Sequence, residues 1–297
     1  MTNGGSASLP DTPAAFRAML AGVGYLADDA VATAAFLALK MHRPLMLEGD
    51  PGAGKTALAL AVSRALDRPL FRLQCYEGLD ASEALYSWDF QRQLLHVRAA
   101  ETTTAEDRSE VEARLYDRRF LQSRPILQSF ETSPSVLLID EVDRADDEFE
   151  AFLLEALSEF SITIPELGRI VAAEPPFTVL TSNRTREVHD ALKRRCLFHW
   201  LDHPTAERER AVLQARFPTL PKGLAVQIVA TVGRLRGEGL LKPPGVSETI
   251  DWAEALAALG ATQLDAATFE LTLGTVVKYH EDQRRIRAKF TLLDAGA

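Results

Sequence analysis

Residues 44–57 read PLMLEGDPGAGKTA and decide the fold. The apolar run 44–48 predicts a strand, and residues 55–65 have the composition of a helix. Between them, residues 49–56 match the pattern G-x-x-x-x-G-K-[ST] in full. Gly52 and Gly54 allow a tight turn whose backbone N–H groups point inward, where an anion can bind. The positive end of the helix that follows adds to this attraction. This strand, loop and helix predict a phosphate-binding site.

Two side chains of this loop have the chemistry that a nucleotide requires. Lys55 supplies a positive charge for the outer phosphates, and the Thr56 hydroxyl can ligate Mg²⁺. We therefore expect ATP and Mg²⁺ as cofactors. The loop residues expected to contact the nucleotide are Gly49, Asp50, Pro51, Gly52, Ala53, Gly54, Lys55, Thr56 and Ala57.

An acidic stretch, DEVDRADDEFE at 140–150, directly follows the apolar run 136–139. Part of it is explained locally, because residues 146–148 start a helix over 146–159 and acids are favourable at a helix N-terminus. Asp140, at the end of the apolar strand, is placed to hold Mg²⁺ together with Thr56. Glu141 would then polarise the attacking water as general base. The alternative for Glu141 is one more solvated acid.

Five short apolar runs alternate with helical patterns, which indicates an α/β fold with a five-stranded parallel sheet. The predicted strands are 44–48, 70–75, 135–140, 177–182 and 197–201. The fourth run is followed by Asn183, a polar residue that we expect beside the water and the γ-phosphate. A turn-forming Asn after a strand is the alternative interpretation.

Two consecutive arginines, Arg194 and Arg195, end a short helix before the last predicted strand. Adjacent helical residues lie about 100° apart, so only one of them can aim at a given point. A guanidinium there can reach a nucleotide held by a neighbouring subunit and stabilise charge in the transition state. A solvated basic helix end is the alternative.

Composition shifts suggest three regions. Residues 1–20 begin polar and rich in Gly, Ser and Pro and are expected to be flexible, 21–204 hold the α/β pattern, and 205–297 read as helices only, a small all-α lid. The α/β region has a long insert at 76–134, in which 86–99 alternate like a hairpin strand pair and 101–110 read as a polar loop. A second hairpin is expected within 161–176.

Composition also limits the class of protein. The chain has 297 residues, 46% of them hydrophobic, and a formal net charge of −9, which disfavours non-specific binding to nucleic acid. The only cysteines, Cys75 and Cys196, sit in short apolar stretches and are expected to be buried free thiols. No run approaches the roughly 20 apolar residues of a membrane span. A cytoplasmic location is expected.

The phosphate loop, VLLIDEVDRA (136–145), the strand ending TSN (181–183), KRR (193–195) and the helical C-terminal region together resemble the AAA+ ATPases over about residues 20–290. The resemblance implies that Asp140 and Glu141 form the Walker B pair and that Asn183 is the sensor-1 residue. It makes Arg195 the arginine finger, with Arg194 as the second candidate. It also implies that Gln74 can hold Glu141 inactive until a substrate engages.

Finer features resemble the MoxR group, namely the hairpin before Asn183 and the long insert after RLQC (72–75). Residues 73–101 and 242–256 resemble its CoxD-like branch. That resemblance implies a partner with a von Willebrand factor A domain and an apo-metalloenzyme substrate such as molybdenum-containing carbon monoxide dehydrogenase. A finger at Arg195 requires a neighbouring subunit, so a ring-shaped homo-oligomer is expected, as a hexamer. Thr249 is a departure, because many AAA+ lids have an arginine there.

Two other functions share the same ATPase core. A nucleic-acid motor or clamp loader would need a concentrated basic stripe, which the acidic chain lacks. A scaffold that binds ATP without hydrolysing it would not need Asp140, Glu141, Asn183 and Arg195 together. The sequence therefore favours ATP hydrolysis that remodels a partner protein.

Overall fold

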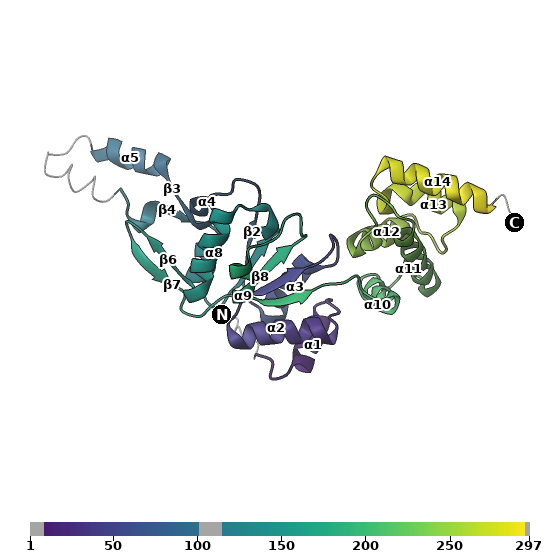
Figure 1. Cartoon of the computed structure of the whole chain (residues 1–297), viewed down its shortest axis with the longest axis horizontal. Helices are drawn as coiled ribbons and strands as arrows, with labels where there is room; N and C mark the ends of the chain where they lie inside the picture. Colours follow the sequence, from purple (N-terminus) through teal and green to yellow (C-terminus); the bar gives the residue numbers. More distant parts are fainter. Residues whose placement is uncertain (1–8, 101–114, 295–297) are drawn as a thin grey trace.

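The computed structural model describes residues 9–100 and 115–294. Its centre is a five-stranded parallel sheet in the order β2-β5-β8-β1-β9 (Figure 1). Each strand lies within one residue of its predicted run. The bounds are Leu45–Glu48 for β1, Leu70–Gln74 for β2, Val136–Asp140 for β5, Phe177–Ser182 for β8 and Leu197–Trp200 for β9.

Helices cover both faces of this sheet, because successive side chains of its strands point to opposite sides. On β1, Leu45 and Leu47 pack into one buried cluster and Met46 into the other. The first cluster includes α1 (Pro13–Gly22), α2 (Asp29–Met41) and α3 (Lys55–Leu66). The second includes α4 (Ala81–Leu85), α7 (Pro125–Glu131), α8 (Asp147–Glu159) and α9 (Asp190–Arg195). Strands β1, β2, β5 and β8 are therefore held between two apolar layers, whereas the edge strand β9 contributes Leu197 to the first cluster alone.

The prediction that residues 1–20 are flexible is wrong for its second half. Residues from Pro13 onward form α1, and Phe16 and Leu20 are fully buried beneath the sheet. Thr12 caps the helix, since its hydroxyl accepts the N–H of Ala15 at 3.1 Å. The polar composition of the first dozen residues hid the apolar spacing that follows. Residues 1–8 lie outside the described part.

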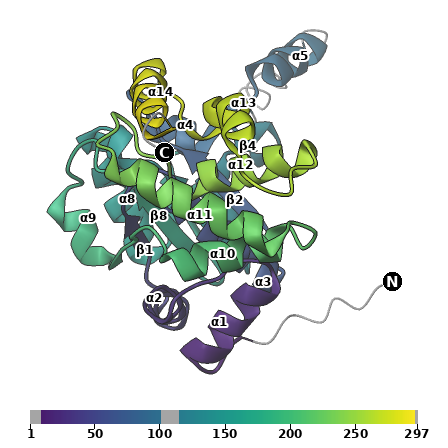
Figure 2. The ribbon, with the colours of Figure 1, turned by 90° about the vertical axis from the view of Figure 1, so that its right-hand side faces the viewer.

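The insert contains a helix where a hairpin strand pair was predicted. Only Tyr86–Trp88 form a strand, β3, which pairs with the distant β4 (Leu121–Ser123). Residues Phe90–Ala100 form α5 instead, which projects from the sheet body in Figures 1 and 2. The apparent alternation is too short to compete with the i, i+4, i+7 spacing of Phe90, Leu94 and Val97. The predicted polar loop at 101–110 lies outside the described residues.

The hairpin expected within 161–176 is confirmed. Strand β6 (Ser161–Ile164) pairs antiparallel with β7 (Gly168–Val171), and Gly168 has a positive φ of 81°. Ile162 and Ile164 are buried in the same cluster as α8, which anchors one strand. The chain then continues through residues 172–176 into β8.

In the described part of the chain, the only regular elements after β9 are helices. They are α10 (Ala206–Arg216), α11 (Lys222–Gly237), α12 (Val246–Ala258), α13 (Ala266–Val276) and α14 (His280–Asp294). They enclose an apolar cluster of their own that includes Trp252, and Figure 2 shows them in front of the sheet. Arg208 of α10 joins them to the N-terminal segment through Asp28 (2.5 Å) and the carbonyl of Leu26 (2.7 Å). Within the described ranges, no helix is long and apolar enough to span a bilayer.

Both cysteines are buried free thiols, as predicted. Burial raises the pKa of Cys75 and of Cys196 to about 12, so neither thiol ionises near neutral pH.

Candidate nucleotide-binding site

The phosphate loop, residues 49–56, joins β1 to α3 at the carboxyl edge of the sheet. Gly49, Gly52 and Gly54 all have positive φ, between 80° and 154°. A Cβ at Gly49 would lie 2.3 Å from the carbonyl oxygen of Leu201, so this position cannot carry a side chain without movement of backbone. The glycines thus let the loop curl tightly over the N-terminus of α3.

Lys55 is buried inside this loop. Its Nζ donates to the carbonyl oxygens of Gly49 (2.7 Å) and Asp50 (2.9 Å). Burial lowers the pKa of Lys55, and the carboxylates of Asp143, Asp50, Asp140 and Glu141 oppose this shift. The ammonium therefore lies inside the curl of the loop, where it could meet an anion.

Asp140 lies at the end of β5 with 3% of its surface exposed. The Thr56 hydroxyl donates to its two carboxylate oxygens at 3.0 and 3.2 Å. Thr181 of β8 donates to Oδ1 at 2.5 Å, and Arg72 of β2 donates to Oδ2 at 2.6 Å. Thr56 and Asp140 together present hydroxyl and carboxylate oxygens, the ligand type that Mg²⁺ prefers, so the predicted pair fits the ion.

Glu141 follows in a left-handed conformation, with φ of 56°. Its N–H donates to the Thr181 hydroxyl at 2.9 Å, so the same threonine holds both acids. Its carboxylate accepts bonds from Gln74 (3.0 Å), Arg144 (3.1 Å) and Asn183 (3.4 Å). The structure thus brings together Glu141 and two residues named from sequence, Gln74 and Asn183.

Asp143 is a residue of this site that the sequence did not single out. It is 2% exposed and accepts bonds from the backbone N–H groups of Asn183 (3.2 Å) and Thr185 (2.8 Å). The Thr185 hydroxyl also donates to it at 2.7 Å. Asp143 therefore fixes the loop after β8 and with it the position of Asn183. Its place three residues after Asp140 was the available signal, masked by the many acids around it.

A cavity of about 390 Å³, here called the phosphate cavity, collects most of these groups. Its lining includes Lys55, Thr56, Arg72, Asp140, Glu141 and Asn183, together with Ser247 of α12. A second cavity of about 530 Å³, the base cavity, continues from Gly52–Gly54 between residues 23–26 and helices α10 and α12. The two cavities share the phosphate loop and Ser247.

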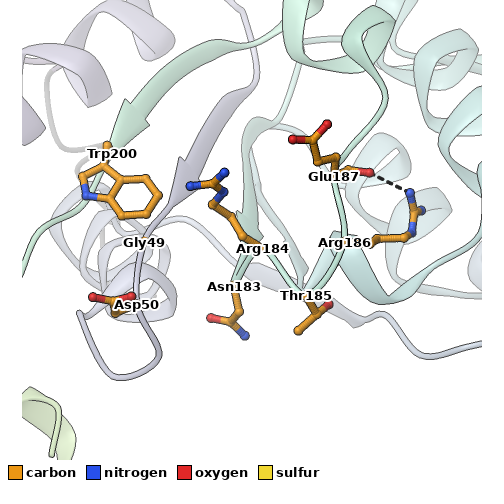
Figure 3. A pocket seen from close by; sticks show the side chains of 8 residues that line it. All are labelled: Gly49, Asp50, Asn183, Arg184, Thr185, Arg186, Glu187 and Trp200. Atoms are coloured by element: carbon orange, nitrogen blue, oxygen red, sulfur yellow. Dashed lines mark hydrogen bonds between the residues drawn. The ribbon is translucent and has the colours of Figure 1, made fainter. Parts of the chain in front are cut away.

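A third pocket of about 450 Å³ lies between the start of the phosphate loop and the loop after β8 (Figure 3). In it the Arg184 guanidinium lies 5.6 Å from the centre of the Trp200 ring. Arg184 is also 3.9 Å from Glu48, a buried acid that Lys193 of α9 approaches to 3.1 Å. These contacts tie α9 to the end of β1.

Arg194 and Arg195 are exposed on α9 and do not line the phosphate cavity. Their backbone is held firmly, however. The Arg43 guanidinium donates to the carbonyl oxygens of Arg194 (2.9 Å), Arg195 (3.0 Å) and Cys196 (3.3 Å). This cap fixes the end of α9 while leaving both predicted finger side chains free to face outward.

Thr249 does not line the phosphate cavity. It is fully buried, and its hydroxyl donates to Glu209 at 2.7 Å, beside the ion pair of Glu209 with Arg236 at 2.8 Å. The C-terminal helices reach the phosphate loop by backbone instead, because the Val246 N–H donates to the carbonyl of Gly52 at 3.1 Å. Position 249 therefore serves the packing of these helices.

Comparisons with known proteins agree with this geometry. The model of the AAA domain (dynein-related subfamily) matches residues 44–196, just over half of the chain. The chain belongs to this family. Residues 44–196 are accordingly a P-loop AAA domain, an ATPase domain that uses ATP and Mg²⁺.

Among individual relatives, the chain is similar to the gas vesicle ATPase GvpN2 of Halobacterium salinarum, 26% identical over 273 residues and covering 87% of this chain and 76% of the relative. It is also 25% identical to an uncharacterized protein, SSP1341, of Staphylococcus saprophyticus, over 59% of this chain and 62% of that one. It thus spans less than two thirds of that relative. A solved structure of a Thermotoga maritima RuvB mutant has a TM-score of 0.46 at 15% identity, covering 93% of this chain and 75% of its own.

The contact between Gly52 and Gly245 yields a test of the docking of α12 on the phosphate loop. A Cβ at Gly245 would lie 2.9 Å from the Pro51 carbonyl oxygen and 3.0 Å from the Cα of Gly52. Because these are backbone atoms that cannot easily move aside, Gly245→Ala should destabilise the docking of α12 on the phosphate loop by about 1–3 kcal/mol. Affinity for a fluorescent ADP analogue, measured by titration, should fall by about five-fold or more.

Gly233→Ala is the matched control, since nothing lies within 4 Å of a Cβ at that helical position. It should bind the analogue as the wild type does. Unchanged affinity in Gly245→Ala would show that the contact is incidental to binding.

Proposed function

We propose that the chain is a Mg²⁺-dependent ATPase that uses hydrolysis to remodel a partner protein. The observation that carries the catalytic part is the placement of Asp140 and Glu141. Their carboxylates line one cavity with Lys55 and Thr56, although the two pairs are 84 residues or more apart in the chain. A net charge of −9 supports a protein partner over a nucleic acid.

In this mechanism Lys55 exchanges the carbonyl oxygens of Gly49 and Asp50 for phosphate oxygens. Thr56 and Asp140 would hold Mg²⁺, which would neutralise phosphate charge when bound. Glu141 takes a proton from the attacking water after its bond to Gln74 opens. Asn183, already on Glu141, orients that water and the γ-phosphate.

The base cavity is proposed to take adenine. It adjoins the phosphate loop, and its lining combines residues 23–26 and apolar side chains such as Val212 and Ile250 with the charged Arg64 and Arg208. Concave sites of this kind bind a flat apolar ring and orient it with a few polar groups.

We infer a hexameric ring of identical subunits, with Arg195 reaching the nucleotide of the neighbouring subunit and Arg194 as the second candidate. The support is geometric. Both arginines lie away from the phosphate cavity of their own chain, and Arg43 holds the backbone beneath them. An exposed guanidinium on a firmly held backbone is suited to stabilising charge on another subunit.

Two substitutions separate binding from hydrolysis. Lys55→Ala removes the buried ammonium and should weaken ATP binding, whereas Glu141→Gln keeps the shape of the base and should retain ATP while turnover falls by about 100-fold or more. Titration with a fluorescent ATP analogue and a phosphate-release assay measure the two effects. Equal turnover in Glu141→Gln and wild type would remove Glu141 from its role.

The same Glu141→Gln protein also tests the ring. With ATP retained, it should assemble into a species of about six subunits in mass photometry, while Lys55→Ala should not. A protein that stays monomeric with saturating ATP would contradict the ring and the role of Arg195.

The surface proposed to engage the partner consists of α5 and the β6–β7 hairpin. On α5, Phe90, Leu94 and Leu95 are 71%, 52% and 66% exposed, and Val171 of β7 is 55% exposed. Exposed apolar side chains concentrated on projecting elements typically mark an interaction site. The hairpin runs on into β8, which is followed directly by Asn183, so a change at the γ-phosphate can reach the hairpin through one continuous segment.

The partner class comes from the resemblance of residues 73–101 and 242–256 to the CoxD-like branch. We propose that the chain opens an apo-metalloenzyme, such as a molybdenum hydroxylase, for cofactor insertion, with a von Willebrand factor A protein as adaptor. The chain is proposed to act in the cytoplasm, with residues 205–297 as its lid.

Replacing residues 164–168 by a short Gly/Ser turn tests the lever. Basal hydrolysis should stay within a few-fold of wild type, because no residue of this turn lines the phosphate cavity. Activity of a molybdenum hydroxylase co-expressed with the chain and its adaptor should be lost. The control is Gly-Ser at the exposed pair Thr262–Gln263, which should support full activity. Normal maturation with the hairpin variant would make the hairpin a purely structural element.

A further inference from the structure

Arg72, in the middle of β2, makes a contact that the proposed mechanism does not use. One guanidinium nitrogen, Nη2, donates to Oδ2 of Asp140 at 2.6 Å and to Oε1 of Gln74 at 2.8 Å. Arg72 lines the phosphate cavity with Lys55 and Thr56, and its side chain is 52% exposed. A half-exposed cation thus contacts the carboxylate proposed to hold Mg²⁺.

The contact continues to the general base. Gln74 accepts from Arg72 with its carbonyl oxygen and donates with its amide nitrogen to Oε2 of Glu141 at 3.0 Å. Because an arginine can only donate, it selects the amide orientation in which the nitrogen faces Glu141. The Arg72 guanidinium therefore connects Asp140, the proposed metal ligand, to Gln74, which holds the general base Glu141.

Electrostatics decide what happens at Asp140. Its other partners, Thr56 and Thr181, are neutral hydroxyls, and Arg72 is the cation with which it forms an ion pair among the described residues. Mg²⁺ and a guanidinium are both attracted to Oδ2. The half-exposed arginine can move into water, and Mg²⁺ would take over compensation of the buried Asp140 charge, so that this charge is not left unpaired. Arg72 is therefore the partner that gives way.

We propose that Arg72 is a positioning residue that couples metal binding at Asp140 to the release of Glu141. When Mg²⁺ enters with nucleotide, Arg72 leaves Oδ2 and withdraws its bond from Gln74. Gln74 then loses the partner that orients it, and its hold on Glu141 weakens. The inference rests on the proposed ATPase mechanism and adds Arg72 to it. The general base Glu141 is freed only after Mg²⁺ is in place.

The test compares the Mg²⁺ dependence of nucleotide binding, which needs no hydrolysis. A fluorescent ADP analogue is titrated at increasing Mg²⁺ into wild type, Arg72→Met, Arg72→Gln and Arg72→Lys. Removing the competing cation should lower the half-saturating Mg²⁺ concentration by about two- to five-fold in the Met and Gln variants. Arg72→Lys, which keeps the charge, should stay near wild type.

Arg17→Met is the matched control, because Arg17 also forms a half-exposed ion pair, with Asp29, and is 48% exposed. It should behave as wild type. A second readout is kcat at saturating Mg²⁺. Arg72→Met should raise it by a few-fold, and adding Arg72→Met to Gln74→Ala should give no further change, because Arg72 acts through Gln74.

Other outcomes overturn the proposal. A Mg²⁺ requirement that rises ten-fold in Arg72→Met would make Arg72 a support for Asp140 as a metal ligand. An unchanged requirement would make the pair a passive surface contact. In either case Mg²⁺-dependent binding by wild type leaves the proposed ATPase standing, whereas its absence in wild type would overturn both.

Discussion

The bonding of the Asp140 carboxylate is the constraint on which the rest of the site depends. It is buried at 3% exposure and followed closely by Glu141 and Asp143, so an unpartnered charge there would cost several kcal/mol. Its oxygens are satisfied by Thr56 of α3, Thr181 of β8 and Arg72 of β2. Because each partner comes from a different element, satisfying one carboxylate fixes three elements against β5.

Two further contacts extend this arrangement outward. Asp143 binds the backbone of Asn183 and thereby sets the loop that follows β8, and the hairpin enters the same strand from its other end. In the C-terminal helices, the Val246 N–H donates to the Gly52 carbonyl, so these helices contact the phosphate loop directly. A change at the bound phosphates can therefore reach both the hairpin proposed to engage the partner and the proposed lid, residues 205–297. No arginine at position 249 is needed for this.

Local chemistry explains what the sequence could predict. Strand bounds and the phosphate loop follow from short-range patterns, and the buried Cys75 and Cys196 from their apolar neighbours. Thr181 and Arg72 were missed because their roles depend on which strands pair and in which register. Strands β2 and β5 align Gln74 with Asp140, and Arg72 lies on the same face as Gln74 because alternate residues of a strand share a face. Helix α5 was missed because β3 pairs with β4, a strand more than 30 residues later, and no local pattern reveals such a partner.

The most direct test of this account is the Mg²⁺ dependence of nucleotide affinity in Asp140→Asn. Asparagine keeps the shape and accepts the hydroxyl bonds of Thr56 and Thr181, but it lacks the charge that attracts a cation. The account predicts a folded protein that binds a fluorescent ADP analogue and has lost about ten-fold or more of the affinity gained from Mg²⁺ in wild type. Full retention of that gain would show that Asp140 does not hold the metal and would contradict the central claim.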